Sequence, residues 1–138
     1  MTIQEKKAYL RKYLESDREI DRLQEELIRC RSIATKITPI VTNAPGGHGG
    51  NRLQSAVEKI SELENQIAGE IEKWRKLRDE IITAISKIDD YQLRTILAKR
   101  YLRGDKWEQI AVDMQYDYRW ILRKHNKALQ QLTIESHY

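Results

Sequence analysis

The residues with the clearest chemical preference lie near the end of the chain, in the segment 118–132. This segment carries four cations and no acid: Arg119, Arg123, Lys124 and Lys127. Arginine donates two parallel hydrogen bonds to guanine or to a phosphate, and lysine is a strong point charge for phosphate. A helix of this composition is suited to the major groove of duplex DNA, so the segment predicts a DNA-binding surface.

Two short helices joined by a tight turn are expected to position these cations. In the first helix, apolar residues fall at i, i+3, i+4 and i+7, as on one buried stripe: Trp107, Ile110, Ala111 and Met114. In the second, the inner face is marked by Ile121, Ala128 and Leu129. Residues 115–117 supply the turn, and the Asp117 carboxylate is expected to cap the second helix by accepting its first free amides. The pattern predicts a helix-turn-helix.

The run 108–132 resembles the fourth conserved region of primary bacterial sigma factors, whose helix-turn-helix reads a promoter element. The two align without a gap, through Glu-Gln-Ile-Ala at 108–111, Met114, Asp117, Ile121 and Ala-Leu-x-x-Leu at 128–132. Two positions depart from the family: Gln115 replaces a usual glycine in the turn, and Lys124 replaces a usual apolar residue. The resemblance implies a small trihelical domain that reads duplex DNA.

The resemblance also implies which side chains face DNA. With Trp120 and Lys127 added from their positions on the helix, the predicted DNA-binding residues are Tyr118, Arg119, Trp120, Leu122, Arg123 and Lys127. We expect Arg123 to contact a base and Lys127, one turn further along, to contact a phosphate. The Trp120 ring is expected to be exposed, available to a base edge, a sugar or the N-terminal helices. The alternative is that the aromatic residues only pack and the cations are solvated.

The whole chain resembles a set of small proteins encoded by phages and prophages of Gram-positive bacteria. These proteins have a long helical first half, a glycine-rich interruption and a last helix that opens with Tyr-Arg-Trp, which stands here at 118–120. The resemblance implies a phage transcriptional regulator, similar to late-gene activators.

Composition limits the class of protein. The chain has 138 residues, no Phe, two Pro and 33% charged residues, which is typical of long helices in an all-α protein. The formal charge of +4 is too small to identify a nucleic-acid partner, so the local distribution of charge has to decide. The single cysteine, Cys30, fits a reducing compartment, and no apolar run suits a membrane span or a signal peptide. We expect a cytoplasmic protein without a membrane partner.

No arrangement of residues in the sequence indicates catalysis. There is no paired nucleophile and base, no acid/base carboxylate pair and no cluster with metal-ligand spacing, and His48 has no nearby Cys, Asp or second His. The glycines at 46–50 lack the Gly-Lys-Ser/Thr ending of a nucleotide loop. We therefore expect neither an enzyme nor a cofactor, a metal or a small-molecule substrate.

Residues 1–87 are expected to form a long antiparallel helical hairpin, similar to a coiled coil, with a Gly-rich connecting loop at 38–51. In the first helix, seam residues follow alternating steps of four and three: Tyr9, Tyr13, Ser16, Ile20, Leu23, Leu27, Cys30, Ala34 and Ile37. In the second helix, the predicted seam is Leu53, Val57, Ile60, Ile67, Ile71, Trp74, Ile81, Ile85 and Ile88. Glu64 and Arg78 interrupt this seam, with Leu63 and Leu77 beside them. Pro39 and the glycines are expected to end the first helix.

Residues 88–138 are expected to form the helix-turn-helix domain. Its first helix should start with Asp89 as the cap and Asp90 in the first turn, and should end at Gly104 in a left-handed conformation. Leu97 and Tyr101 should complete a small trihelical core with Ile110, Ala111, Ile121 and Leu129.

Two classes of function remain after these observations. In the first, the chain is a DNA-binding regulator whose N-terminal helices form a homodimer or contact RNA polymerase. In the second, it is a helical assembly protein that keeps a sigma-like fold without binding specific DNA. Fold resemblance alone does not separate the two classes.

Overall fold

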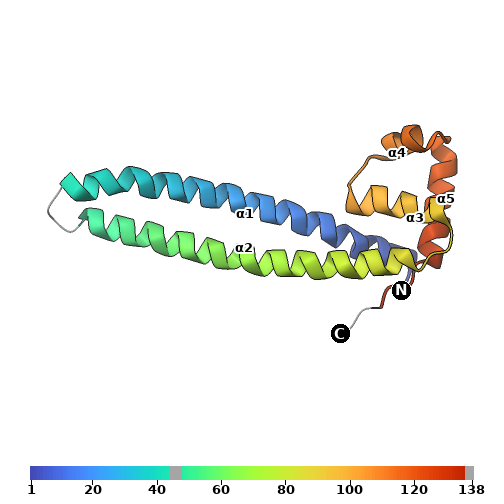
Figure 1. Cartoon of the computed structure of the whole chain (residues 1–138), viewed down its shortest axis with the longest axis horizontal. Coiled ribbons are helices and arrows are strands. Elements are labelled where there is room, and N and C mark those ends of the chain that lie inside the picture. Colours follow the sequence, from blue (N-terminus) through green and yellow to red (C-terminus); the bar gives the residue numbers. More distant parts are fainter. Residues whose placement is uncertain (44–47, 136–138) are drawn as a thin grey trace. The chain divides into compact units, whose positions relative to one another are not determined.

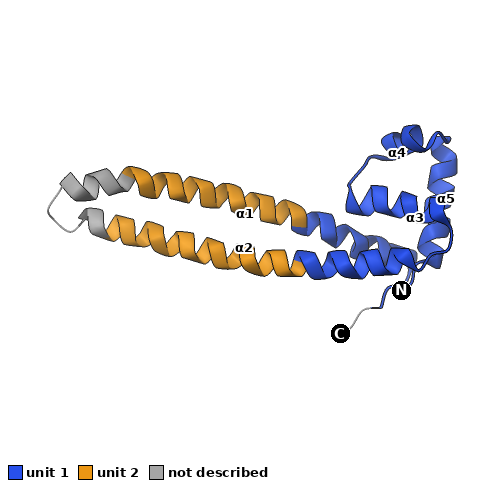
Figure 2. Cartoon of the chain, in the orientation of Figure 1, with its two compact units in different colours: residues 1–16, 74–138 blue, residues 17–73 orange. Residues whose placement is uncertain are grey.

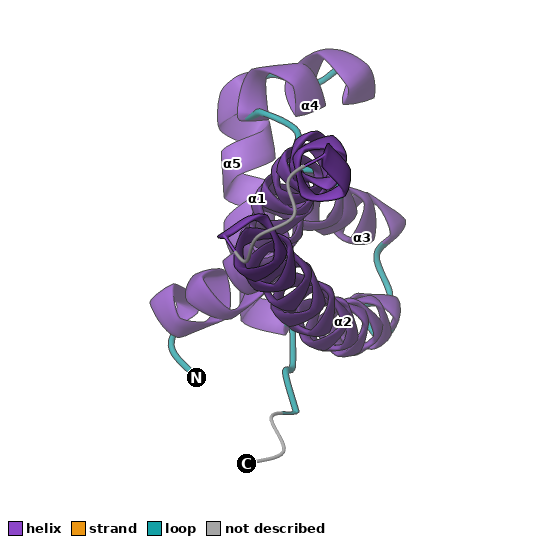
Figure 3. Cartoon of the chain, turned by 90° about the vertical axis from the view of Figure 1, so that its left-hand side faces the viewer, coloured by secondary structure: helices purple, strands orange, loops and turns teal. Residues whose placement is uncertain are grey.

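All regular elements in the described part of the chain are helices, as predicted (Figures 1 and 3). The computed structural model describes the backbone of residues 1–43 and 48–135 and the side chains of residues 1–36 and 51–135. The elements are α1 (Ile3–Asn43), α2 (His48–Ser86), α3 (Tyr91–Leu97), the π-helical η1 (Ala98–Leu102), α4 (Trp107–Met114) and α5 (Tyr118–Gln131). Two long antiparallel helices are thus followed by short packed helices at the C-terminal end.

The chain divides into two compact units, which Figure 2 colours separately. Unit 1 contains residues 1–16 and 74–138, and unit 2 contains residues 17–73. The domain boundary expected at residues 87 and 88 therefore lies inside unit 1, because the first turns of α1 and the last turns of α2 pack with the short helices.

In unit 2, α1 and α2 pair through a narrow apolar seam. Its buried members are Leu23, Leu27, Leu63 and Ile67, with Cys30 and Ile60 partly buried beside them. Beside the seam, the Arg31 guanidinium donates to the Glu64 carboxylate at 3.1 Å. The predicted α1 seam is confirmed where side chains are described, although Ile37 lies outside that part.

The predicted seam of α2 was partly wrong. Val57 and Ile71 are 54% and 41% exposed, whereas Leu63 is buried and Leu77 packs against the core of unit 1. The helix is rotated slightly from the predicted orientation. Because Leu63 and Leu77 are apolar and Glu64 and Arg78 are charged, this rotation buries the leucines and leaves the two charges in water.

The long helices also extend further than predicted. α1 continues through Pro39 to Asn43, and α2 starts at His48, so both enter the segment predicted as the loop 38–51. Proline removes only its own amide from the helical hydrogen-bond ladder, and flanking residues with helical dihedrals can continue the helix on both sides. Residues 44–47 lie outside the described part of the chain.

Unit 1 has two adjoining cores. The larger one joins both long helices to α3 and α5, and its largest fully buried side chains are Leu10, Ile81, Leu93, Leu97, Leu129 and Leu132. The smaller one joins α3, α4 and α5 through Ile96, Ile110, Ala111 and Ile121. Every residue predicted for the trihelical core is buried, so the predicted inner faces of the three short segments are confirmed.

The helix that precedes the helix-turn-helix differs in two details from the prediction. Its cap is Asp90 rather than Asp89: the Asp90 carboxylate accepts hydrogen bonds from the amides of Gln92 at 2.8 Å and Leu93 at 3.4 Å. The last turn widens into η1, where the Arg103 amide donates to the Ala98 carbonyl at 3.1 Å. Gly104 has the predicted left-handed conformation, with φ of 78°.

None of the helices in the described ranges has an apolar stretch of the length and hydropathy that would cross a membrane.

Candidate nucleic-acid interface

The turn between α4 and α5 closes with a left-handed residue. Gln115 has φ of 59° and ψ of 41°, and its amide donates to the Val112 carbonyl at 3.2 Å. The next amide, of Tyr116, donates to the Ala111 carbonyl at 3.1 Å, which completes a Schellman motif. A glycine would adopt this conformation without strain. The left-handed backbone at Gln115 therefore explains why the sigma-factor turn that this segment resembles usually has a glycine at this position.

Asp117 starts α5 by its backbone only. Its φ of −61° and ψ of 142° are those of a cap residue, but its side chain makes no capping hydrogen bond. The prediction that its carboxylate accepts the first amides of α5 was therefore wrong. Asp117 is exposed, so water can solvate both the carboxylate and the free amides, and no burial forces them together.

The inner face of α5 is fixed at several points within unit 1. Ile121, Ala128 and Leu129 have no exposed surface. Near the end of the helix, the Lys6 ammonium donates to the Leu129 carbonyl at 2.8 Å. A cation at this place is favourable because the last carbonyls of a helix lack partners and carry partial negative charge. These contacts determine which residues of α5 point outward.

The outward face of α5 is a stripe of cations. Arg119, Arg123 and Lys127 are exposed and follow one another at intervals of four residues, a span of about 12 Å at 1.5 Å per residue. Asn126 and Gln130 are exposed on the same stripe, at seven and eleven residues from Arg119. These two amides were not among the predicted contact residues, although helical spacing from Arg119 would have identified them.

Two further predicted contact residues border this stripe. Tyr118, in the first turn of α5, is 40% exposed, and Leu122 is half-buried. Both remain partly accessible, so their predicted role in facing DNA stays a prediction.

Trp120 is not the freely exposed ring that the sequence predicted. It is half-buried and stacks on Tyr116, with ring centroids 3.8 Å apart and an interplanar angle of 15°. The Lys124 ammonium lies 5.2 Å from the centroid of the Trp120 ring, and the Tyr116 hydroxyl accepts a hydrogen bond from the Gln92 side chain at 2.8 Å. The stack thus ties α5 to the turn and to α3. The contact with the Trp120 ring is also compatible with a lysine at position 124, where the sigma-factor region that this segment resembles usually has an apolar residue.

A buried imidazole on α5 also escaped the sequence analysis. His125 is 5% exposed, and its Nε2 shares a hydrogen bond of 2.7 Å with the Tyr101 hydroxyl. The Trp107 ring lies against it with centroids 4.4 Å apart, and the Arg100 guanidinium lies 4.5 Å from the Trp107 centroid. These contacts join α5 to η1 and α4.

The buried environment of His125 lowers the pKa of its imidazole. Burial, followed by repulsion from Lys7, Arg100 and Arg11, lowers the pKa of His125 from 6.5 to about 4. Burial also raises the pKa of the Tyr101 hydroxyl. Both side chains are therefore neutral near pH 7, and His125 is a structural residue rather than a fifth cation of α5.

The charge of the chain is distributed unevenly between the two units. Unit 1 contains seventeen Lys and Arg residues against eleven Asp and Glu residues, whereas unit 2 contains eight against ten. The formal net charge of +4 is therefore the sum of a basic unit 1 and a slightly acidic unit 2. Unit 1 is also the unit that contains the cationic stripe of α5, as expected for a polyanion-binding surface.

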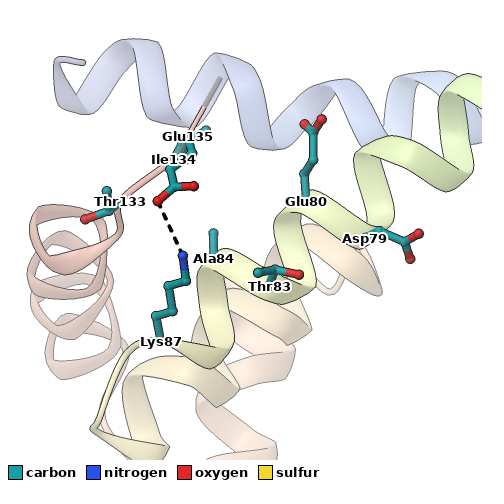
Figure 4. Close-up of a pocket in the computed structure, with 8 residues that line it drawn as sticks. All are labelled: Asp79, Glu80, Thr83, Ala84, Lys87, Thr133, Ile134 and Glu135. Atoms are coloured by element: carbon teal, nitrogen blue, oxygen red, sulfur yellow. Dashed lines mark ion pairs between the residues drawn. The ribbon is translucent and has the colours of Figure 1, made fainter. Parts of the chain in front are cut away.

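A cavity of about 230 Å³ lies elsewhere in unit 1, between the end of α2 and the segment after α5 (Figure 4). Its walls carry the carboxylates of Asp79, Glu80 and Glu135, of which Glu135 pairs with the Lys87 ammonium at 3.6 Å. Glu80 accepts a hydrogen bond from the Tyr9 hydroxyl. Negative walls repel a phosphate, so this cavity does not suit the same ligand as α5.

No group of three or more His, Cys, Asp or Glu side chains is placed to hold a metal ion among the residues that the structure describes. The His48 side chain, which the sequence analysis considered for this role, lies outside the described side chains.

The architecture defines the chain as an all-helical protein with a long antiparallel pair and a helix-turn-helix arrangement of α4 and α5. Comparison with models of known protein families, with curated proteins and with solved structures gives no match.

Proposed function

We propose that the chain is a phage or prophage transcriptional regulator that binds duplex DNA through the outward face of α5. The observation that supports this proposal most strongly is the stripe of Arg119, Arg123 and Lys127 on a helix whose opposite face is buried and which contains no acid. A rigid helix with accessible cations fits the width of the major groove and neutralises phosphates on both sides of it.

Individual contacts follow from the position of each residue along α5. Arg123 lies near the middle of the stripe and acts as the base-reading residue, since arginine binds guanine through two parallel hydrogen bonds. Lys127, one turn further along, binds a phosphate. Tyr118, Arg119 and Leu122 border the same groove from the first turns of α5. Trp120 contributes indirectly, because its stack on Tyr116 holds the start of α5 against the turn.

In this proposal the N-terminal helices act as the second functional element. They associate with another copy of the chain or contact RNA polymerase, which connects DNA binding to the control of transcription. A homodimer presents two copies of α5 and suits an operator with two half-sites.

A second candidate is a helical assembly protein that does not bind specific DNA. It is favoured by the exposed aliphatic side chains of unit 2, which DNA reading by α5 does not require: Ile28, Ile33, Val57 and Ile71. The two candidates differ in what the cations of α5 do, so their substitution separates them.

The test starts from a site selected by the protein from random duplex DNA. Arg123→Ala should weaken binding to that site by roughly 1 to 3 kcal/mol and relax the preference at one base position. Lys127→Ala should weaken binding to the selected site and to random duplex about equally, and should lower the salt dependence by about one ion. Isotherms at several salt concentrations measure both effects. Equal and weak binding by the wild type and both variants would support the assembly protein instead.

A further inference from the structure

The outer surface of α2 in unit 2 carries a second apolar row that pairing with α1 leaves uncovered. Val57 and Ile71 are 54% and 41% exposed. They lie fourteen residues apart, which is four turns of helix, and therefore point in the same direction. Exposed aliphatic residues are common singly, but two at this spacing form one face.

One ion pair between α1 and α2 shows on which side of the helix pair this face lies. Glu64 lies midway between Val57 and Ile71, two turns from each, and it accepts a hydrogen bond from Arg31 of α1 at 3.1 Å. Ile28, one turn before Arg31, is 66% exposed and lies on the same side of α1. Both helices of unit 2 thus present aliphatic residues on the side where Arg31 and Glu64 meet.

The face on α2 continues between its two ends with the spacing of a coiled coil. Exposed residues follow steps of four, three, four and three: Val57, Ser61, Glu64, Ala68 and Ile71. This spacing keeps one face of a helix against a partner helix with the same repeat. The order of side chains is also the same in both directions, with a β-branched residue at each end, a small residue inside each end and the carboxylate at the centre.

We propose that this face, the 57–71 seam, binds the same seam of a second copy of the chain in antiparallel orientation, with the two-fold axis at Glu64. Val57 then packs against the partner's Ile71, and Ser61 lies within one residue, about 1.5 Å along the helix, of the level of the partner's Ala68. The small residues allow the two helices to approach closely. A second copy provides a complementary order of side chains by symmetry, because an antiparallel partner presents the same seam in reverse and the order of side-chain types reads the same in both directions.

The charge at the centre of the seam is compatible with the same occupant. Two Glu64 carboxylates would repel each other in a two-fold contact. Each carboxylate already has Arg31 as a partner, so two copies bring two guanidinium groups to two carboxylates. Arginine has enough donors to contact both carboxylates, and the central charges therefore balance.

The inference does not rest on DNA binding, since all its residues belong to unit 2 and none belongs to α5. It specifies which of the two roles proposed for the N-terminal helices the 57–71 seam serves.

Disulfide trapping tests the orientation directly, in a chain whose single cysteine has been removed by Cys30→Ala. The variants Val57→Cys and Ile71→Cys, mixed and oxidised, should cross-link to each other, because these positions face across the proposed axis. Neither variant alone should cross-link, since two copies of either position lie about 21 Å apart along the helix, and a disulfide needs Cα atoms within about 7 Å. Glu64→Cys alone should cross-link with itself.

Sedimentation of the full chain tests the interface without a cross-link. The wild type should dimerise, and Ile71→Glu should raise the dimer dissociation constant by roughly tenfold or more, since it replaces an aliphatic end of the seam with an unpaired carboxylate that faces the partner's Val57. Ile33→Glu is the matched control: Ile33 is 45% exposed and lines a groove with Cys30, Arg52 and Lys59, away from the 57–71 seam. It should leave dimerisation unchanged, and both variants should keep the helical circular dichroism of the wild type.

Three results would overturn the proposal. A wild-type chain that stays monomeric at all concentrations would exclude a second copy and leave the seam to another protein. Cross-linking of Val57→Cys with itself would show a parallel arrangement. Loss of the dimer in Ile33→Glu but not in Ile71→Glu would place the contact on the opposite side of unit 2.

Discussion

The buried imidazole of His125 should make the stability of unit 1 depend on pH. Its ring is enclosed by Tyr101 and Trp107, and the cations Lys7, Arg11 and Arg100 surround it. A proton on this ring would add a charge in a buried and already positive environment. Folding therefore favours the neutral form, and acid should destabilise the folded state.

The size of the effect follows from the two pKa values. The unfolded chain binds a proton at His125 below about pH 6.5, whereas the folded chain binds it only below about pH 4. Within that interval only the unfolded state is protonated, so the free energy of unfolding falls by about 1.4 kcal/mol per pH unit. The stability contributed by the neutral imidazole is fully present above pH 6.5. By pH 4, about 3 kcal/mol of it should be lost.

Urea unfolding followed by tryptophan fluorescence measures this loss. The three tryptophans, Trp74, Trp107 and Trp120, all belong to unit 1, so their fluorescence reports the unit that contains His125. The matched variant is His125→Gln, which has a side-chain amide for the Tyr101 hydroxyl but no group that titrates in this range. As the pH falls from 6.5 to 4, the free energy of unfolding should decrease less steeply in this variant than in the wild type. The two slopes should differ by about 1.4 kcal/mol per pH unit.

Equal slopes in the two proteins between pH 6.5 and 4 would refute the reasoning, because the titration of carboxylates is common to both. An imidazole that titrates near 6.5 in the folded chain, as read from the NMR shifts of the ring, would refute it independently.

Two further predictions concern packing and capping. Leu27→Asp places an unpaired carboxylate in the buried seam of unit 2 and should lower the free energy of unfolding by several kcal/mol, whereas the exposed Ile33→Asp should cost roughly 0.5 kcal/mol or less; retention of helicity and melting temperature in Leu27→Asp would contradict the observed pairing face. Asp90→Ala removes the carboxylate that caps α3 and should cost about 1 kcal/mol, but Asp117→Ala should cost clearly less because that side chain makes no capping hydrogen bond. Chemical denaturation of both alanine variants measures the difference, and equal losses would show that Asp117 caps α5 in solution.

The helices themselves were predictable because their apolar spacing is strong and their interiors hold little glycine or proline. The orientation of α2 was harder to predict. Two seams share Ile60, Ile67 and Trp74 and differ only at positions such as Leu63 against Glu64. The predicted seam included Val57 and Ile71 together with two charged residues, Glu64 and Arg78. The structure instead buries Leu63 and leaves Leu77 half-buried. The exposed aliphatic row that results is the surface on which the proposed dimer depends.

The cationic positions of the candidate interface were also predictable, since helical spacing from Ile121 determines which residues point outward. The placement of Trp120 and His125 was not. Each depends on a partner brought close by the fold, Tyr116 for the tryptophan and Tyr101 for the histidine. The choice between Asp89 and Asp90 as a cap likewise depends on a backbone angle that adjacent acids in a sequence do not reveal.

The most direct measurement of the central claim is the affinity of the full chain for duplex DNA before and after two charges are removed from α5. The variant is Arg119→Ala/Arg123→Ala. The matched control, Arg22→Ala/Arg29→Ala, removes the same charge from exposed arginines of unit 2 that pair with acids one turn earlier.

Retention on heparin, binding isotherms and sequencing of protected DNA should agree if α5 reads DNA. The wild type and the control should bind with similar affinity and protect the same sequence, and the α5 variant should lose both the affinity and the protection. Equal binding by all three proteins, or equal loss in both variants, would contradict the claim that α5 is the DNA-binding surface.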